Sequence, residues 1–511
     1  IENRKTIAEI KFAALIAEKN IPFETAESIL SFFQNLGEYP EVLKSMRMNR
    51  NKALKVIKNV LRVREQERFV EKLQNNKFSI FVDETSDLTN DKWMTFLVRA
   101  EKLFTNFRAE MWENQIPFSN IFALSCDNAS VMTGKYESFK INLQKHCKSL
   151  ITMPCPYHAS ALVANAACSA IPEACEELMR KGASFISSSP KRACIFEQFQ
   201  KSFRFDGICR KILKLSETRW LSRHACVARL NENWEVLLKL LQEEQLSEKS
   251  KSGAALLYLM QNSEIQAYLL FFEYILDVFN KFNSSFQTEE TKVHLLQSAT
   301  ENFLKTVLKN VVIASLLNFV SIGTINPLLA CNRFSPDQVM IGEACQDLLD
   351  RLNQEGQGEI VKSVYDNCLA FYDIAAKQIR NKLFVKDKFL SKLTIFEPKF
   401  ALQQEDKKNS SNNSVQDVLF VVQRFGGFDE EILKELQFLK KDFTSEQKAT
   451  IINLHFDEAW KTTMTTKKAD GKFLITITNP NNSYISVTKE TKIQSPVTEC
   501  ILHTSLLTMS V

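Results

Sequence analysis

Apolar and polar positions alternate or cluster in short runs in only a small part of the chain. One run covers residues 78–83 and ends at Asp83, and another covers residues 121–127 and ends at Asp127. Both are short, rich in β-formers and followed by polar turn residues, which is typical of a buried strand. Residues 92–100 predict a further strand between them, and residues 102–115 predict a helix.

Most of the remaining chain has apolar residues at three- and four-residue spacing, which predicts helices. Residues 1–75 have this pattern, and it returns from Pro172 to about Gly427. Its clearest examples are residues 254–259, 265–282 and 307–319. A polar segment at 403–414 is typical of a mobile loop. In the tail, residues 472–478 and 484–488 alternate around an Asn-Pro-Asn-Asn turn and predict a hairpin.

Length and composition narrow the classes of protein. A chain of 511 residues is too long for one ordinary core, so we expect two or three domains. The 65 basic and 60 acidic residues leave a net charge of only +5, which alone implies no nucleic-acid partner. Twelve scattered Cys predict reduced thiols in an intracellular protein, nuclear or cytoplasmic. Glu273 and Asp277 interrupt the most apolar stretch, so we expect no membrane span.

Asp83 and Asp127 are the first candidates for chemistry. Open α/β sheets place their sites beyond the carboxyl ends of strands, where two carboxylates can share a divalent metal. The alternative is that each Asp caps the following turn. Cys155 and His158 have zinc-like spacing, but a structural zinc site needs four ligands, and a buried Cys beside a locally bonded His is the alternative. Neither a Gly-rich phosphate loop nor a G-x-S-x-G elbow occurs, which disfavours P-loop and serine-hydrolase chemistry.

Positive charge is concentrated between Val42 and Arg64, where eight residues are basic and none is acidic. On a continuous helix, five of them would share one face along which phosphates could bind. The alternative is a solvated helix face. The five residues are Lys44, Arg47, Lys55, Lys58 and Arg62.

A second candidate for binding is the segment 216–224. Arg219 and Arg223 are four residues apart and so would share a helical face, next to Trp220. An Arg fork can bind phosphate, and an indole can stack on an unpaired base. A core Trp flanked by surface Arg residues is the competing interpretation.

Taken in order, these segments resemble the transposases of the hAT superfamily, and most of all transposase-derived animal proteins, which often carry a BED-type zinc finger upstream. The resemblance covers about residues 5–463. It rests on Phe81-Val-Asp-Glu-Thr-Ser-Asp87, Ala123-Leu-Ser-Cys-Asp-Asn-Ala-Ser-Val-Met-Thr-Gly134, Pro154-Cys-Pro-Tyr-His-Ala-Ser-Ala-Leu-Val163, the segment 185–192 and Leu213-Lys-Leu-Ser-Glu-Thr-Arg-Trp-Leu-Ser-Arg-His224.

The resemblance implies an α/β RNase H-like core interrupted by a large all-α insertion domain, in a chain that is predominantly helical overall. It further implies a DDE triad that binds Mg²⁺ or Mn²⁺, with Asp83 and Asp127 as the first two acids and Glu458 as the third, or Asp457 in its place. His158, Arg219 and Trp220 match positions that contact DNA. The expected divisions are 1–75 (helical and basic), 76–170 (first part of the core), 171–440 (insertion), 441–463 (helix returning to the core) and 464–511 (divergent tail).

Departures from the family's pattern shape the expected function. We find neither the third antiparallel strand nor the C-terminal dimerisation region, so catalytic transposition is expected to be lost. The sequence then favours a transposon-derived protein that binds DNA. The alternatives are a helical protein-interaction scaffold and an active metal-dependent DDE transposase. A homo-oligomer formed through the insertion domain is a further expectation.

Overall fold

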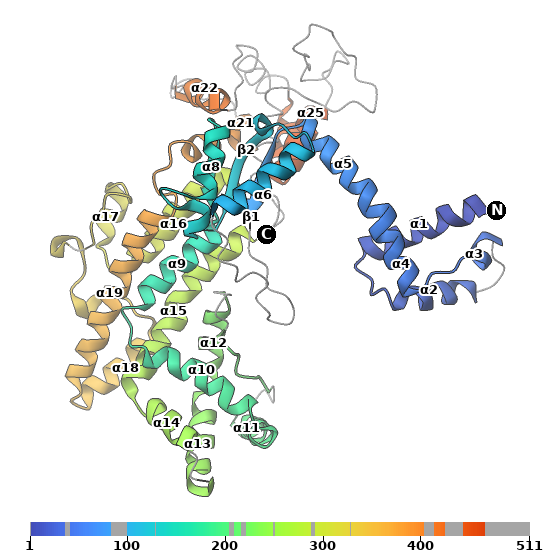
Figure 1. The fold of residues 1–511 in the computed structure, drawn as a ribbon. Coiled ribbons are helices and arrows are strands. Elements are labelled where there is room, and N and C mark those ends of the chain that lie inside the picture. The colour runs from blue at the N-terminus through green and yellow to red at the C-terminus, as the bar shows by residue number, and fades with distance from the viewer. Residues whose placement is uncertain are drawn as a thin grey trace. The chain divides into compact units, whose positions relative to one another are not determined.

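A computed structural model describes residues 2–35, 41–82, 100–127, 129–203, 209–215, 221–248, 251–287, 292–327, 329–402, 413–424 and 443–465. Within these residues the chain is predominantly helical, with one small sheet, which confirms the expected helical character (Figure 1). The chain divides into two compact units. Unit 1 comprises Ile1–Ile80, Met94–Phe122 and Lys135–Leu150, and unit 2 comprises Phe81–Trp93, Ala123–Gly134 and Ile151–Val511.

The sheet contains three short strands in the order β1, β2, β3. Their bounds are β1 (Phe78–Val82), β2 (Ile121–Cys126) and β3 (Ile151–Pro154), so the two strands that end before Asp83 and Asp127 are confirmed. β2 pairs with β3 in parallel, with Ala123 opposite Ile151 and Cys126 opposite Pro154. β3 was not predicted. The expected strand at 92–100 lies outside the described residues except for Ala100, which begins a helix.

Unit 1 begins with a small helical cluster. Its helices are α1 (Glu2–Glu18), α2 (Thr25–Gln34), α3 (Glu41–Ser45), α4 (Arg50–Val56) and α5 (Arg62–Asn75), and a π-helical turn, Ile57–Leu61, joins α4 to α5. Ile16 and Leu30 pack with Met46 and Met48 in the centre of this cluster. The predicted helical pattern of residues 1–75 is therefore confirmed.

The rest of unit 1 contains α6 (Ala100–Glu113) and α8 (Phe139–His146), which pack on each other. The Phe104 ring meets the Phe139 ring edge-on at 5.7 Å. Asn120 donates from Nδ2 to the Gln74 carbonyl at 2.8 Å, and Gln74 donates from Nε2 to the Asn114 carbonyl at 2.8 Å. These bonds attach the end of α5 to the segment that follows α6.

Unit 2 contains a large helical assembly with one continuous apolar core. Its elements are α7 (Ser130–Thr133), α9 (Pro156–Cys168), α10 (Ala174–Ser187), α11 (Pro190–Phe203), α12 (Leu221–Glu232), α13 (Trp234–Glu248), α14 (Lys251–Met260), α15 (Ser263–Phe286), α16 (Leu296–Leu308), α17 (Ala314–Phe319), α18 (Glu343–Gln354), α19 (Gly358–Lys382), α20 (Leu390–Leu393), α21 (Pro398–Leu402), α22 (Asn413–Arg424), α24 (Ser445–Ile452) and α25 (Phe456–Thr465).

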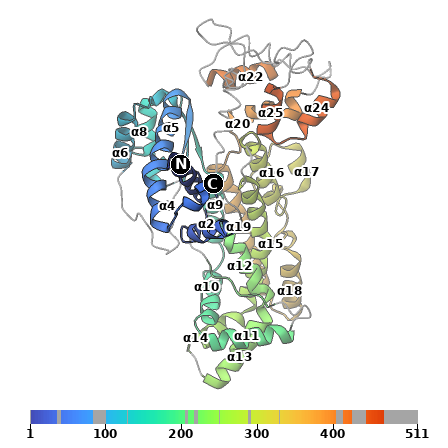
Figure 2. The same ribbon diagram turned by 90° about the vertical axis from the view of Figure 1, so that its right-hand side faces the viewer.

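Helices α9, α15 and α19 run side by side through the centre of unit 2 (Figures 1 and 2). Aromatic rings interlock there, with the Phe271 ring edge-on to the Phe371 ring at 5.3 Å. Such dense burial is the main source of stability for a helical domain. Helices α11, α13 and α14 gather at one end of unit 2, and α22, α24 and α25 lie at the other (Figure 2).

The single helix predicted at 307–319 is wrong. α16 ends at Leu308, the chain turns through a bridge between Val312 and Arg333, and α17 begins only at Ala314. The cause is Asn310, which is fully buried and accepts a hydrogen bond from the Tyr274 hydroxyl at 2.7 Å. Three β-branched residues follow Asn310, and they favour the extended conformation of the turn.

Candidate nucleic-acid interface

The predicted acidic residues lie at different kinds of position. Asp83 lies outside the described residues, directly after β1. Asp127 follows β2, is half-buried, and accepts a hydrogen bond on Oδ1 from the Ala129 N–H at 3.2 Å. This contact is an Asx turn, which is what the capping interpretation of Asp127 requires.

Glu458 and its alternative, Asp457, are both exposed in the first turn of α25. The helix itself is firmly packed on neighbouring parts of unit 2. The Phe456 ring stacks on the His294 ring at 4.3 Å, and the indole of Trp460 donates to the Phe396 carbonyl at 2.8 Å. Burial lowers the pKa of His294 to about 4, against an opposing effect of the nearby Asp457 carboxylate.

In the part of the chain that the structure describes, no group of three or more His, Cys, Asp or Glu side chains could hold a metal ion. The oxygen ligands of Asp127 and Glu458 are of the type that Mg²⁺ and Mn²⁺ prefer. Because Asp83 lies outside the described residues, the convergence of the triad stays a prediction.

The predicted contacts near Cys155 belong to the start of α9. Pro156 occupies the first position of the helix, and the His158 ring meets the Tyr157 ring edge-on at 5.4 Å. Cys155 is buried. The two residues therefore lie in the local packing of α9, and the role of His158 at DNA stays a prediction.

Arg223 is largely buried and forms an ion pair within unit 2. Its side chain is only 12% exposed and pairs with Glu176 at 3.1 Å. Burial raises the pKa of Glu176, but the charge and hydrogen bond of Arg223 together with Arg180 outweigh it, so the pKa is lowered. Burial likewise raises the pKa of the adjacent Cys168 thiol to about 12. Arg219 and Trp220 lie outside the described residues.

A cavity of about 530 Å³ lies beside the Arg223–Glu176 pair, between the end of α9 and the start of α10. Phe272 of α15 and Asn367 of α19 also line it. Asn367 donates to the Tyr268 hydroxyl at 2.7 Å, so this amide of the lining is already hydrogen-bonded within unit 2.

The basic stretch of unit 1 is not one helix, as the sequence predicted. The chain leaves helical geometry after α3 because Met46 and Met48 are buried in the N-terminal core. It re-enters a helix at α4, where Asn49 caps the start by accepting on Oδ1 from the Lys52 N–H at 2.9 Å. Lys44 and Arg47 therefore lie outside the helix that carries the other basic residues.

The five predicted residues nevertheless share a property. Each is exposed, and none forms an ion pair with an acidic residue in the described chain. The other three basic residues of the stretch are paired, Arg50 with Glu24, Lys52 with Glu9 and Arg64 with Glu67. We call the following set the basic surface: Lys44, Arg47, Lys55, Lys58 and Arg62.

A buried carboxylate fixes this region. Glu9 is 6% exposed, accepts from the Arg47 N–H at 3.0 Å and pairs with Lys52 Nζ at 2.6 Å. Burial raises the pKa of Glu9, but the hydrogen bonds from Arg47 and Lys52 outweigh it, so its pKa is lowered. Glu9 therefore holds the turn between α3 and α4 while the neighbouring cations face solvent.

The π-helical turn Ile57–Leu61 changes the helical register within the same region. The Arg62 N–H donates to the Ile57 carbonyl, five residues back. The turn packs on α1, with Ile57 and Leu61 half-buried against the N-terminal core, while Lys58 is exposed. Such turns are frequent at functional sites.

Sequence reasoning missed a second basic stretch. Residues 190–215 contain seven basic and two acidic residues, and this excess of positive charge could have identified the stretch from the sequence. Lys211 and Lys214 are exposed within it, and neither forms an ion pair with a described acidic residue. The charge of Lys211 does act on the nearby Glu197, whose pKa is lowered chiefly by Lys201.

Among the described residues, no helix combines the length and apolar character that crossing a bilayer requires. A scan against known protein families and a search of curated proteins both found no match for this chain.

Proposed function

We propose that this chain is a transposon-derived, hAT-like protein that binds nucleic acid through the basic surface. The observation that carries the proposal is the set of five exposed cations that form no ion pair with an acidic residue in the described part of the chain. Free cations on a folded scaffold can replace the counterions of a phosphate backbone, and the release of those counterions drives binding. Paired cations would first have to give up their partners.

An RNase H-like core is part of this proposal and rests on the ordered sequence motifs. β2 and β3 are parallel neighbours in a sheet, and two of the motif carboxylates follow β1 and β2. A long helical stretch then separates β3 from α25, which carries Glu458. We propose that catalytic transposition is lost, because the sequence before α6 shows no pattern for the third antiparallel strand of such a core. Transposase activity would require Asp83, Asp127 and Glu458 to converge around Mg²⁺ or Mn²⁺.

Salt-dependent DNA binding tests the proposal. We compare the full chain with the variant Lys55→Ala/Lys58→Ala/Arg62→Ala on a duplex of arbitrary sequence. Each phosphate contact contributes about 0.9 to the slope of log K against log salt for duplex DNA, so the variant should lose roughly 2.7 of that slope. Circular dichroism should show unchanged helicity, because all three side chains are exposed.

A matched control removes three cations of α4 and α5 that already have acidic partners. These are Arg50 with Glu24, Arg64 with Glu67 and Arg68 with Glu65. The triple alanine variant of this set changes the net charge by the same amount, but it should alter the slope much less. Equal effects of the two variants would reduce the proposal to nonspecific attraction, and absence of salt-sensitive binding in the wild-type chain would overturn it.

A second candidate function is a helical interaction scaffold that self-associates through unit 2. It is favoured by the exposed Phe319 (88%) at the end of α17 and by the exposed Leu329 and Met340 between α17 and α18, which leave apolar surface in contact with water. Sedimentation of the wild-type chain and of Phe319→Ser tests this function. A dimer that the substitution converts to monomer supports it, and a monomeric wild-type chain contradicts it.

A further inference from the structure

The second basic stretch lies in unit 2 and contains a segment with no regular secondary structure. Residues 209–215 connect the region after α11 to the region before α12. Lys211 and Lys214 are exposed there, whereas Arg210 pairs with Glu232. The surplus of five positive charges in residues 190–215 equals the net charge of the whole chain, so this stretch is strongly cationic for its length.

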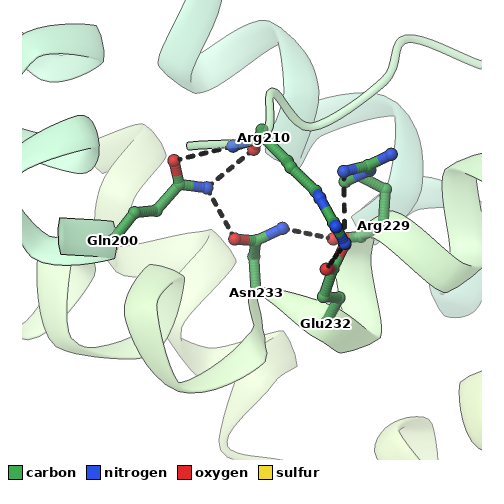
Figure 3. Close-up of polar contacts among 5 residues, drawn as sticks. All are labelled: Gln200, Arg210, Arg229, Glu232 and Asn233. Carbon is green, nitrogen blue, oxygen red and sulfur yellow. Dashed lines mark hydrogen bonds and ion pairs between the residues drawn. The ribbon is translucent and has the colours of Figure 1, made fainter. Parts of the chain in front are cut away.

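A buried glutamine holds the backbone of this segment. Gln200 is 2% exposed and makes two hydrogen bonds to the same residue. Its Nε2 donates to the Arg210 carbonyl at 2.6 Å, and its Oε1 accepts from the Arg210 N–H at 3.1 Å. Figure 3 shows the amide of Gln200 facing Arg210 in this way. The Gln200 amide thus bonds to both the backbone N–H and the backbone carbonyl of Arg210, as a neighbouring β-strand would.

Asn233 extends the network behind Gln200. It is fully buried at the junction of α12 and α13, and its Oδ1 accepts from Gln200 Nε2 at 2.6 Å. Its Nδ2 donates to the Arg229 carbonyl at 2.7 Å. Glu232 pairs with Arg210 and, at 3.3 Å, with Arg229 (Figure 3). Buried amides are costly unless they are bonded, and here they bond to one another and to the backbone.

The segment is also fixed at its other end. The Cys226 thiol of α12 donates to the Lys214 carbonyl at 3.3 Å. Ile212 packs between these attachments against the apolar core of unit 2. The backbone beside Lys211 and Lys214 is therefore ordered before any ligand binds, which lowers the entropic cost of binding.

We propose that segment 209–215 is a second nucleic-acid contact, in which Lys211 and Lys214 bind backbone phosphates. Gln200 and Asn233 act as positioning residues that hold the segment. This inference rests on the proposed function and extends it to unit 2. Because ammonium groups bind phosphate as point charges, the contact is independent of base sequence.

The first experiment measures duplex binding by the full chain carrying Lys211→Ala/Lys214→Ala. The salt slope should fall by about 1.8, with weaker binding at low salt. The matched control is Lys281→Ala/Lys362→Ala, which removes two exposed lysines from α15 and α19 of the same unit and should leave the slope unchanged. Equal slopes for the wild type and Lys211→Ala/Lys214→Ala would overturn the inference. If Lys55→Ala/Lys58→Ala/Arg62→Ala still lowers the slope in that case, the proposed function survives. Absence of DNA binding by the wild-type chain would contradict both this inference and the proposed function.

The second experiment tests positioning. Gln200→Ala should reduce the salt slope although both lysines remain, and it should add nothing when combined with Lys211→Ala/Lys214→Ala. A merely structural role would lower the unfolding midpoint and leave the slope of the folded protein unchanged, which would contradict the positioning role. If Gln200→Ala does not fold, Cys226→Ala offers a milder test, because it removes only the contact with the Lys214 carbonyl.

Discussion

The carboxylate of Glu9 lies 2.6 Å from the ammonium nitrogen of Lys52, across 43 residues of sequence. The same carboxylate accepts the Arg47 N–H. One buried acid therefore neutralises one cation of the basic stretch and fixes the backbone next to another. The backbone position of Arg47 in the basic surface therefore depends on this contact.

Glu9→Gln should destabilise the chain by about 1–2 kcal/mol, because a neutral amide keeps an acceptor for Arg47 but loses the charge that attracts Lys52. Urea unfolding of the two proteins at neutral pH measures this difference. Glu24→Gln is the control, since its partner Arg50 is exposed and such surface pairs contribute little.

The effect of Glu9→Gln should also depend on pH. The pKa of Glu9 in the folded chain is below its ordinary value of 4.5, so its contribution is fully present above that value. It is lost as the pH falls through the folded pKa, where the carboxylate becomes protonated. The stability difference between wild type and variant should therefore shrink below about pH 4.5. A constant difference down to pH 3 would contradict this account.

Much of the fold followed from local patterns. The strands β1 and β2 and the helices α14 and α15 lie where apolar spacing predicted them. β3 was missed because it has four residues and ends in Pro154, too short for a period to show. The break after α16 was missed because its cause, the Tyr274–Asn310 contact, joins residues that are distant in sequence.

The site was less predictable for the same physical reason. A count of charges identified the basic stretch, but not which cations Glu9, Glu24 and Glu67 neutralise. A helical projection failed because Met46 and Met48 leave the helix to fill the core. The sequence predicted that Arg223 contacts DNA. It could not predict the ion pair with Glu176, because that pair depends on the packing of α10 on α12.

His294 should make stability depend on pH between about 4 and 6.5, above the range in which Glu9 titrates. Its folded pKa of about 4 lies below the ordinary 6.5, so the unfolded chain binds more protons between these values. Stability should fall by up to about 1.4 kcal/mol for each pH unit from 6.5 to 4. His294→Phe keeps a ring against Phe456 and should flatten this dependence in thermal unfolding. The exposed His455→Gln should not, and equal pH profiles for wild type and His294→Phe would refute the assignment.

Gly342 should be intolerant of a side chain. Its φ is +90°, and an added Cβ would lie 2.7 Å from the Cβ of Tyr274. Gly342→Ala should cost about 2 kcal/mol or more, from backbone strain together with the clash. Gly356 has a φ of +81° and open space around it, so Gly356→Ala isolates the strain and should cost about 1 kcal/mol. Urea unfolding measures both, and similar losses would show that the Tyr274 contact relaxes.

Trp460 attaches α25, which carries Glu458, to the Phe396 backbone within unit 2. The indole is 2% exposed and donates to the Phe396 carbonyl at 2.8 Å, so Trp460→Phe leaves both a cavity and an unsatisfied carbonyl. We expect a loss of about 2–3 kcal/mol in the free energy of unfolding. Trp112→Phe is a matched control, because Trp112 is 84% exposed and the same substitution should change stability by less than about 0.5 kcal/mol. Hydrogen exchange adds a local measurement, since α25 should lose protection in Trp460→Phe before the core helices α15 and α19 do. Unchanged protection would mean that α25 is held by other contacts, and the position of Glu458 would then not depend on this indole.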